Sequence, residues 1–265
     1  MEKLQLPILE SSFEYSPLDH ARMKAASLND LPGDLNASDG YDCKICKNRG
    51  YTAVVSDGNI RTLVCQCVPI RQSIIRMQQS GLKDKIRDCT FDKFIATDPW
   101  QKAIKDAAMK YAAEPEGWFA LCGQSGCGKT HLCTAICRKL LYAGKIVRYM
   151  LWRDEIVRIK DEAQNGTGVQ SILEEYKNCD VLYIDDLFKC GDAKPTSADI
   201  NYAFEILNFR YNNPHLLTII STELTVGELL NVDEAIGGRI CERSTPISIS
   251  RSRDKNYRIR KEVSL

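Results

Sequence analysis

Two kinds of apolar pattern alternate along the chain from residue 117 onward. Short runs of apolar, often β-branched residues predict five strands, at 118–122, 145–151, 181–184, 216–220 and 246–249. Between them, apolar residues recur at helical spacing and predict helices at 129–143 and 197–211, a pair divided near 165–168, and two short helices within 224–243. Apolar strands that alternate with helices are typical of a parallel sheet covered by helices on both faces.

The first part of the chain follows other patterns. Residues 1–40 mix Ser, Asp, Pro and Gly with a short helical possibility at 17–27, which favours a docking segment or a partly ordered tail; a disordered leader without a role fits the composition as well. Two strand-like runs, 51–55 and 60–64, predict a hairpin around the turn 56–59.

A basic stretch joins this hairpin to the rest of the chain. Residues 69–87 alternate basic and apolar positions at helical spacing, with a break at Ser80-Gly81, and predict a basic helical linker whose charges can equally be a solvated face. Asp98-Pro99 then predicts the start of a helix that runs to about residue 113. We therefore divide the chain into an N-terminal segment (1–40), a small module with its linker (41–88) and an α/β domain (89–265).

Composition and charge narrow the class of protein. A chain of 265 residues with 44% hydrophobic content can bury a core. Its net charge of +1 hides different ends: residues 1–40 carry seven acids against three Lys/Arg, whereas residues 239–261 carry eight Lys/Arg against two acids. No apolar run approaches the roughly 20 residues of a membrane span, and the start has no signal-peptide pattern. We expect a cytoplasmic protein without membrane contact and with its twelve cysteines reduced.

Residues 123–130 have the spacing of a phosphate-binding loop, because Gly123 is followed by four residues and then by Gly128-Lys129-Thr130. Glycines let backbone amides surround an anion, and the helix after the loop directs its positive end at the same place. Lys129 is expected to reach the terminal phosphates and the Thr130 hydroxyl to bind Mg²⁺. The expected nucleotide-binding residues, which include the loop and the residue after it, are Gly123, Gln124, Ser125, Gly126, Cys127, Gly128, Lys129, Thr130 and His131. Cys127 inside the loop suggests sensitivity of ATP binding to oxidation.

The strand 181–184 ends in two carboxylates. At the mouth of a parallel sheet, a first acid can hold the Mg²⁺ of a bound nucleotide and a second can orient or deprotonate the attacking water. We assign Asp185 to the metal and Asp186 to the water. A strand that simply ends in an acidic turn is the plainer interpretation.

Two cysteine pairs flank the predicted hairpin. Cys43 and Cys46 precede it, and Cys65 and Cys67 follow it, so that four thiols would meet at one end of two strands. Tetrahedral Zn²⁺ takes four such ligands, and so short a segment has little core of its own without a metal. An iron–sulfur cluster, a redox pair or free thiols in a plain hairpin remain alternatives.

These features resemble a known family. The phosphate loop with Asp185-Asp186 is similar to ATPases of the AAA+ class, and residues 43–260 resemble the bacterial and phage helicase loaders of the DnaC/DnaI type. The cues are the cysteine pairs together with Cys89-Thr-Phe-Asp-Lys-Phe94, Thr218-Ile-Ile-Ser-Thr-Glu-Leu224, Gly238-Arg-Ile-Cys-Glu-Arg243 and Asn256-Tyr-Arg258. The resemblance implies a five-stranded AAA+ core without a C-terminal helical lid, after a zinc-ribbon-like N-terminal domain.

The resemblance also implies roles for further residues. Glu223 occupies the position where the family usually carries the Asn of sensor one, and since an ionised acid cannot donate a hydrogen bond, Thr222 is a substitute candidate. Arg243, with Arg239 one turn earlier, falls where the family carries an arginine finger that acts on the ATP of a neighbouring subunit. Arg258 resembles a second sensor. From the residues alone, each arginine can also be an ordinary surface residue.

The leading hypothesis is an ATP-controlled loader that grips a replicative helicase through its N-terminal region, holds single-stranded DNA on its ATPase domain and self-associates into a partial ring or spiral. The basic residues Arg251, Arg253, Lys255, Arg260 and Lys261 are candidates for DNA contact. An IstB-type ATPase that assists transposition shares the core, but such relatives generally lack the cysteine module. A small-molecule kinase and a nucleotide-gated module that does not hydrolyse ATP are the remaining alternatives.

Overall fold

The computed structural model describes residues 16–78, 85–166, 168–191 and 193–259, which belong to two compact units, the first ending at Val68 and the second beginning at Pro69. The predicted break at Ser80-Gly81 and the basic residues Arg260 and Lys261 lie outside the described residues.

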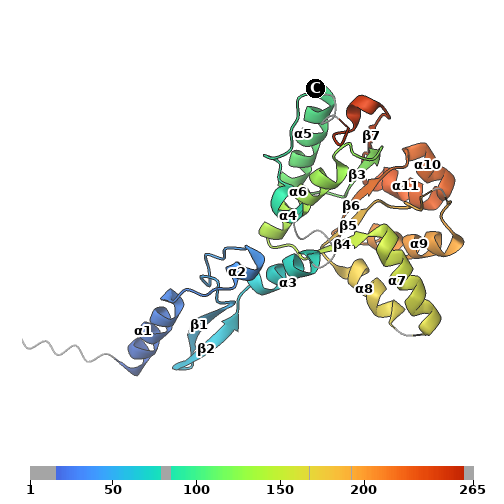
Figure 1. The fold of residues 1–265 in the computed structure, drawn as a ribbon. Helices are drawn as coiled ribbons and strands as arrows, with labels where there is room; N and C mark the ends of the chain where they lie inside the picture. Colours follow the sequence, from blue (N-terminus) through green and yellow to red (C-terminus); the bar gives the residue numbers. More distant parts are fainter. Residues whose placement is uncertain (1–15, 79–84, 167, 192, 260–265) are drawn as a thin grey trace, which may run out of the picture. The chain divides into compact units, whose positions relative to one another are not determined.

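The first unit pairs a helix with a hairpin (Figure 1). Its elements are α1 (Pro17–Asp30), the single turn α2 (Asn36–Asp39), and the antiparallel strands β1 (Tyr51–Ser56) and β2 (Asn59–Val64). Ser16 caps α1 in a reciprocal arrangement with Asp19. Near the end of α1, the Asn29 side chain donates to Ala53 O and accepts from Ala53 N, both at 2.8 Å, so that it occupies the open backbone edge of β1. The predicted hairpin is confirmed.

The second unit contains a five-stranded parallel sheet in the order β4-β5-β6-β3-β7. Its strands are β3 (Trp118–Gly123), β4 (Val147–Leu151), β5 (Val181–Asp185), β6 (Leu217–Thr222) and β7 (Ile247–Ile249). Its helices are α4 (Lys85–Asp88), α5 (Pro99–Ala113), α6 (Lys129–Tyr142), α7 (Trp152–Asn165), α8 (Val169–Asn178), α9 (Ser197–Tyr211), α10 (Val226–Val232), α11 (Glu234–Arg243) and the 3₁₀ turn η2 (Arg253–Lys255). The helix α3 (Cys67–Met77) leads into this unit from the cysteine module.

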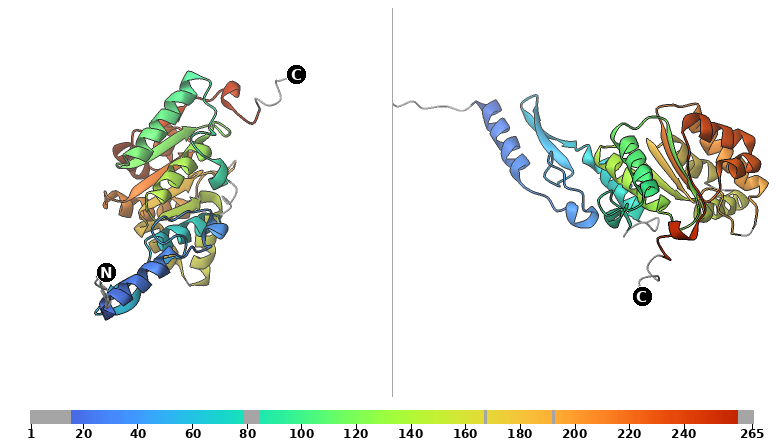
Figure 2. Two further views of the ribbon diagram at one scale, coloured as in Figure 1. Left: turned by 90° about the vertical axis from the view of Figure 1, so that its left-hand side faces the viewer. Right: turned by 90° about the horizontal axis from the view of Figure 1, so that it is seen from above.

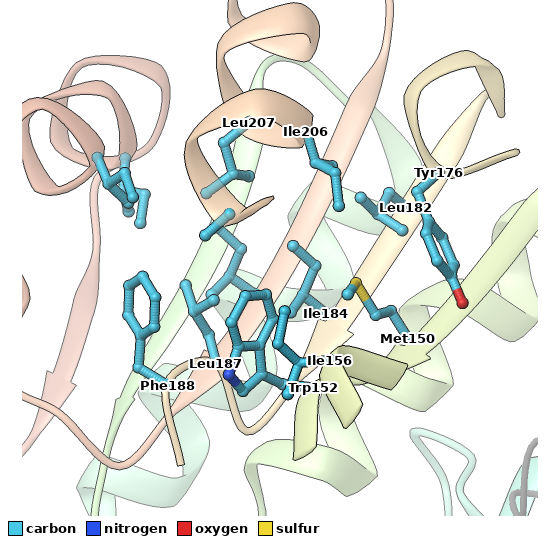
Figure 3. Close-up of a cluster of buried hydrophobic side chains, with 14 of the residues drawn as sticks. Met150, Trp152, Ile156, Tyr176, Leu182, Ile184, Leu187, Phe188, Ile206 and Leu207 are labelled. Carbon is cyan, nitrogen blue, oxygen red and sulfur yellow. The ribbon is translucent and has the colours of Figure 1, made fainter. Parts of the chain in front are cut away.

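Helices cover both faces of the sheet, as the sequence predicts (Figure 2). α5 packs on α6, which covers one face, whereas α7, α8, α9 and α11 lie on the other. Successive side chains of a strand point to opposite faces of the sheet. Leu182 and Ile184 therefore enter the core beneath α7 to α11, and Tyr183 faces the α6 side. Figure 3 shows this core, in which Trp152 meets Phe188 edge to face with 5.3 Å between ring centroids.

Candidate functional site

The loop between β3 and α6 contains two glycines that side chains from other parts of the second unit approach closely. At Gly126 (φ 77°) an added Cβ would lie 2.1 Å from Oδ1 of Asn256, and at Gly128 (φ 93°) it would lie 2.7 Å from the Phe94 ring. Both positions combine a left-handed backbone with no room for a side chain, so glycine is required there. α6 begins at Lys129 and directs its unpaired N–H groups into the loop.

Lys129 and Thr130 occupy the first turn of α6. The Lys129 ammonium donates to the carbonyl oxygens of Gly123 at 2.7 Å and Gln124 at 2.9 Å, which holds the positive charge over the loop. The Thr130 hydroxyl donates to Oδ1 of Asp185 at 3.0 Å. The structure therefore brings Thr130, Lys129 and Asp185, which the sequence predicts for phosphate and Mg²⁺, into one place.

Asp185 ends β5 and accepts hydrogen bonds from hydroxyl groups on three strands. Tyr183 OH lies 2.7 Å from Oδ1, Tyr149 OH lies 3.0 Å from Oδ2, and Ser221 Oγ also donates to Oδ1. Burial, together with the negative charge of Asp185, raises the pKa of both tyrosines, so both phenols stay protonated and remain donors. Asp185 is only 3% exposed, and these donors keep it aimed at Thr130.

Sequence reasoning missed all three of these partners. Tyr183 is two positions before Asp185 on the same strand, so strand alternation alone places it on the same face. Tyr149 and Ser221 come from β4 and β6, and only the register of those neighbouring strands reveals them.

Asp186 follows β5 with a left-handed backbone (φ 57°) that is uncommon for a residue other than glycine. Its amide donates to Ser221 Oγ at 3.2 Å, and its carboxylate pairs with Lys189 at 2.9 Å. The same Lys189 ammonium donates to Glu223 at 2.8 Å. The sequence interpretation did not include Lys189.

The two sensor-one candidates have different surroundings. Thr222 is fully buried, and its hydroxyl donates to the Leu187 carbonyl at 2.8 Å and accepts from the Leu224 amide at 3.1 Å. Both hydrogen bonds of this hydroxyl thus stabilise neighbouring backbone. Glu223 lines the cleft beside the phosphate loop, and Thr222 is absent from the described residues that line it.

A cleft of about 370 Å³ opens beside the loop, and its lining includes the polar or charged residues Lys129, Thr130, Asp186, Lys189 and Glu223. The lining also includes Phe94, Ile95 and Tyr257. His131 lies beside Phe94: its Nε2 lies 2.8 Å from Thr90 O, and its ring meets Phe94 at a centroid distance of 5.3 Å. A lining that combines charged groups with aromatic and apolar ones suits a ligand that carries phosphates and a planar base.

The segment after β7 ties itself to the phosphate loop. The Tyr257 amide donates to Gly126 O at 2.9 Å, and Arg258 donates to Ser125 Oγ at 3.2 Å. The Gln124 side chain exchanges hydrogen bonds with the backbone of Ser252 at 2.7 and 2.6 Å. Arg258, predicted as a second sensor, thus lies at the cleft, whose lining includes it.

Cys127 is part of the loop, and its side chain points into the protein interior. It is fully buried, and its thiol donates to Gln124 O at 2.9 Å. Burial raises the pKa of the Cys127 thiol, so the reactive thiolate is disfavoured at neutral pH.

Comparison with known proteins identifies the family. Residues 70–261 match the family described as IstB-like ATP binding protein. The chain belongs to this family. XkdC of the phage-like element PBSX of Bacillus subtilis (strain 168) is 34% identical over 228 residues, which are 81% of this chain and 84% of that protein. An IstB-like chain with an intact phosphate loop is an ATP-binding protein and an ATPase of the AAA+ class.

Helicase loaders are among the similar proteins. The replicative helicase loader DnaC of Escherichia coli (strain K12) is 31% identical over 127 residues, which are 46% of this chain and 52% of DnaC. A crystal structure of the DnaC helicase loader shares the fold, with a TM-score of 0.55 at 21% identity over 63% of this chain and 98% of that one. The predicted AAA+ architecture and the predicted loader family are thereby confirmed.

In this IstB-like chain, the arginines at the end of α11 lie against α9. Arg239 donates to Asn208 at 3.1 Å and covers the ring of Phe204 at 4.9 Å, whereas Arg243 donates to Tyr211 O and covers the Tyr211 ring at 4.9 Å. Neither is among the described residues that line the nucleotide cleft of their own chain. A role at a neighbouring subunit stays a prediction for both.

The four predicted metal ligands of the first unit lie together. The Sγ atoms of Cys43, Cys46, Cys65 and Cys67 are all within 4.8 Å of one another, and all four residues are buried. Cys43 and Cys65 are 3.8 Å apart at sulfur, and Cys46 and Cys67 are 3.5 Å apart. A Zn–S bond of about 2.3 Å puts the corners of a tetrahedron about 3.8 Å apart, so the cluster fits Zn²⁺. The thiols are free, and the Gly50 amide donates to Cys46 Sγ at 3.3 Å, a bond that favours the thiolate.

Within residues 16–78, 85–166, 168–191 and 193–259, no helix combines the length and the apolar character that crossing a bilayer requires.

Proposed function

We propose that this chain is an ATP-dependent loader of a replicative DNA helicase, and that ATP hydrolysis controls its assembly and release. The similarity to the replicative helicase loader DnaC carries this proposal. A replicative DNA helicase acts in the cytoplasm, and we place the protein there as well.

The nucleotide cleft supplies the ATP-dependent part of the proposal. The loop amides and Lys129 bind the phosphates, Arg258 reaches the same loop, and Asp186 orients the attacking water. Mg²⁺, when bound by Thr130 and Asp185, would neutralise charge on the phosphate oxygens. Arg243, or less directly Arg239, would complete the cleft of a neighbouring subunit, so that hydrolysis depends on self-association.

The first unit is the proposed helicase-binding part. A zinc ion held by the four cysteines would fix its hairpin. Apolar side chains are exposed on it, among them Met23 and Leu31 at 56% and Val64 at 77%. Exposed apolar groups on a small metal-stabilised unit suit docking to another protein.

Single-stranded DNA is the second proposed partner. Arg251 and Arg253 are exposed after β7, in a stretch with Lys255, and phosphate contacts by such residues would hold a DNA backbone.

The test is a pull-down of the host's replicative helicase with the purified chain, with ATP, with ADP and without nucleotide. The proposal predicts a helicase complex whose amount changes with the nucleotide. No helicase in any of the three conditions would contradict it.

An ATPase that assists transposition is the second candidate, and the IstB-like family match favours it. The same pull-down separates the two functions, because this candidate predicts a transposase in place of the helicase.

A further inference from the structure

Lys189 pairs with two carboxylates in the lining of the nucleotide cleft. Its ammonium lies 2.9 Å from Asp186 Oδ2 and 2.8 Å from Glu223 Oε1, and all three residues line the cleft with Lys129 and Thr130. A lysine ammonium has three N–H donors. Two are used by these carboxylates, which leaves one for a group in the cleft.

The fold fixes where Lys189 starts. The turn after β5 is anchored by Leu187, whose amide donates to Ser221 O at 2.9 Å and whose side chain is fully buried. Phe188 is buried against Trp152, and the Lys189 amide donates to Asp186 O at 2.9 Å. The Lys189 side chain therefore projects from an anchored turn and is only 35% exposed, unlike a lysine on a solvated helix face.

The charges in the lining of the cleft show why a cation is needed. Asp186 and Glu223 are acidic and would repel a terminal phosphate, whereas Lys129 lies in the loop. Glu223 also interacts with Lys129 and with the Ser125 hydroxyl, so it stands between the loop and Lys189. An ionised Glu223 accepts hydrogen bonds but donates none. A donor to the terminal phosphate on this side must come from another residue.

We propose that Lys189 binds the terminal phosphate of ATP with its third N–H, held in place by Asp186 and Glu223, and so lets the cleft distinguish ATP from ADP. Glu223 then acts through Lys189 as a positioning residue. Lys189 provides the positive charge, and the carboxylates of Asp186 and Glu223 hold its ammonium in position. The inference rests on the ATP site of the proposed function and is independent of the helicase and of DNA.

The ionisation states agree with this arrangement. Partial burial acts to lower the pKa of Lys189, but hydrogen bonds to Glu223 and Asp186 outweigh it, and the pKa lies above its ordinary value. Burial acts to raise the pKa of Glu223, but the bond to Lys189 and its charge outweigh burial, and the pKa lies below its ordinary value. Both groups are charged at neutral pH.

If Lys189 only neutralised the two carboxylates, its loss would change the affinities for ATP and ADP equally. The test therefore compares the two affinities. ATP and ADP affinities are measured by calorimetry, with Mg²⁺, for wild type and for Lys189→Met. A charged hydrogen bond contributes about 1.5–3 kcal/mol, so ATP affinity should fall roughly 10- to 100-fold while ADP affinity changes less than about twofold. Turnover should fall by about 100-fold, as for loss of one transition-state donor.

Further variants make the result specific. Lys194→Met removes an exposed lysine from the same loop and should change neither affinity. Lys189→Arg keeps the charge and should restore part of the ATP preference. Lys189→Gln can still bond to Glu223 but has no charge; it should lose the preference, and it serves if the Met variant does not fold.

Equal losses of ATP and ADP affinity in Lys189→Met and Lys189→Gln, or no loss in either, would overturn the role of Lys189. Failure of the wild-type chain to bind ATP would instead refute the ATP site itself. The two failures are thus distinguishable in one set of measurements.

Discussion

At the scale of single residues, the carboxyl end of β5 separates two acids that are adjacent in sequence. The Asp185 carboxylate is buried and accepts hydrogen bonds from hydroxyl groups, whereas Asp186 has a left-handed backbone and lines the cleft. The environments therefore differ although the residues are neighbours. This separation is what allows one acid to serve a metal and the other to serve water.

Asp186→Asn should keep ATP binding and stall hydrolysis, because the amide oxygen can still accept the hydrogen bond from Lys189 whereas the side chain can no longer accept a proton. We expect turnover to fall by about 100-fold or more with the ATP dissociation constant little changed. Steady-state kinetics and calorimetry measure the two. Asp161→Asn, on the exposed side of α7, is the matched control. Undiminished turnover would move the catalytic role to another group.

Cys127 should be alkylated slowly at neutral pH. Burial raises its pKa above the ordinary value of 9.0, so the thiolate fraction is small at pH 7.5 and grows only as the pH rises toward the raised pKa. Peptide mass spectrometry after iodoacetamide treatment should show Cys241, which is less buried, labelled before Cys127. Preferential labelling of Cys127 would support the oxidation-sensitive loop that the sequence suggests.

Only part of the site was accessible from the sequence at this scale. The phosphate loop and Asp185-Asp186 are local patterns, and the structure brings them together. Lys189 was missed because its contacts depend on a turn with two residues at positive φ, Asp186 and Phe188, which apolar periodicity does not reveal. Ser221 was missed for another reason, since its neighbours follow from strand register.

At the scale of elements, the predicted strands and helices are confirmed with small shifts at their ends. β3 and β5 each continue into a site residue, Gly123 and Asp185. These polar or small ends break the apolar pattern, and so the sequence placed the strand ends too early. α5 and α9 match their predicted bounds because each begins with a capping box, at Asp98 and at Thr196.

The cysteine hairpin yields the clearest test at this scale. Cys43→Ser with Cys46→Ser should remove one zinc ion per chain and unfold the first unit, because structural zinc contributes about 10 kcal/mol or more in small domains. Metal analysis and limited proteolysis measure the two effects, and the melting of the second unit should be unchanged. Cys190→Ser, at a partly exposed cysteine outside the cluster, is the control. A zinc-free wild type with an intact hairpin would eliminate the metal site.

At the scale of the whole molecule, the parallel five-stranded sheet and the family were predicted from the strand pattern and the motifs, whereas the order of the strands was not, nor was the unit to which residues 69–78 and 85–88 belong. Residues 69–78 and 85–88 fall in the second compact unit, and the family match begins at residue 70. A charged helical stretch shows no sequence feature that distinguishes a linker from a peripheral helix, since both are amphipathic.

Self-association would place Arg243 of one protomer at the nucleotide cleft of the next. Wild-type turnover per protomer should rise with protein concentration, and Arg243→Ala should keep ATP binding but lower turnover by ~10³-fold, as expected for an arginine finger. Hydrolysis assays over a dilution series, with sedimentation in parallel, measure this effect. Arg153→Ala, an exposed arginine on α7, is the control. Turnover that is insensitive both to dilution and to Arg243→Ala would remove the finger role.

The most direct test of the loader function is transfer of the host's replicative helicase onto circular single-stranded DNA, measured by unwinding of an annealed strand. With ATP, the wild-type chain should increase unwinding several-fold, and Lys129→Ala, which should not bind ATP, should give no increase. An increase that is equal with Lys129→Ala, or no increase with the wild-type chain and ATP, would contradict an ATP-dependent loader.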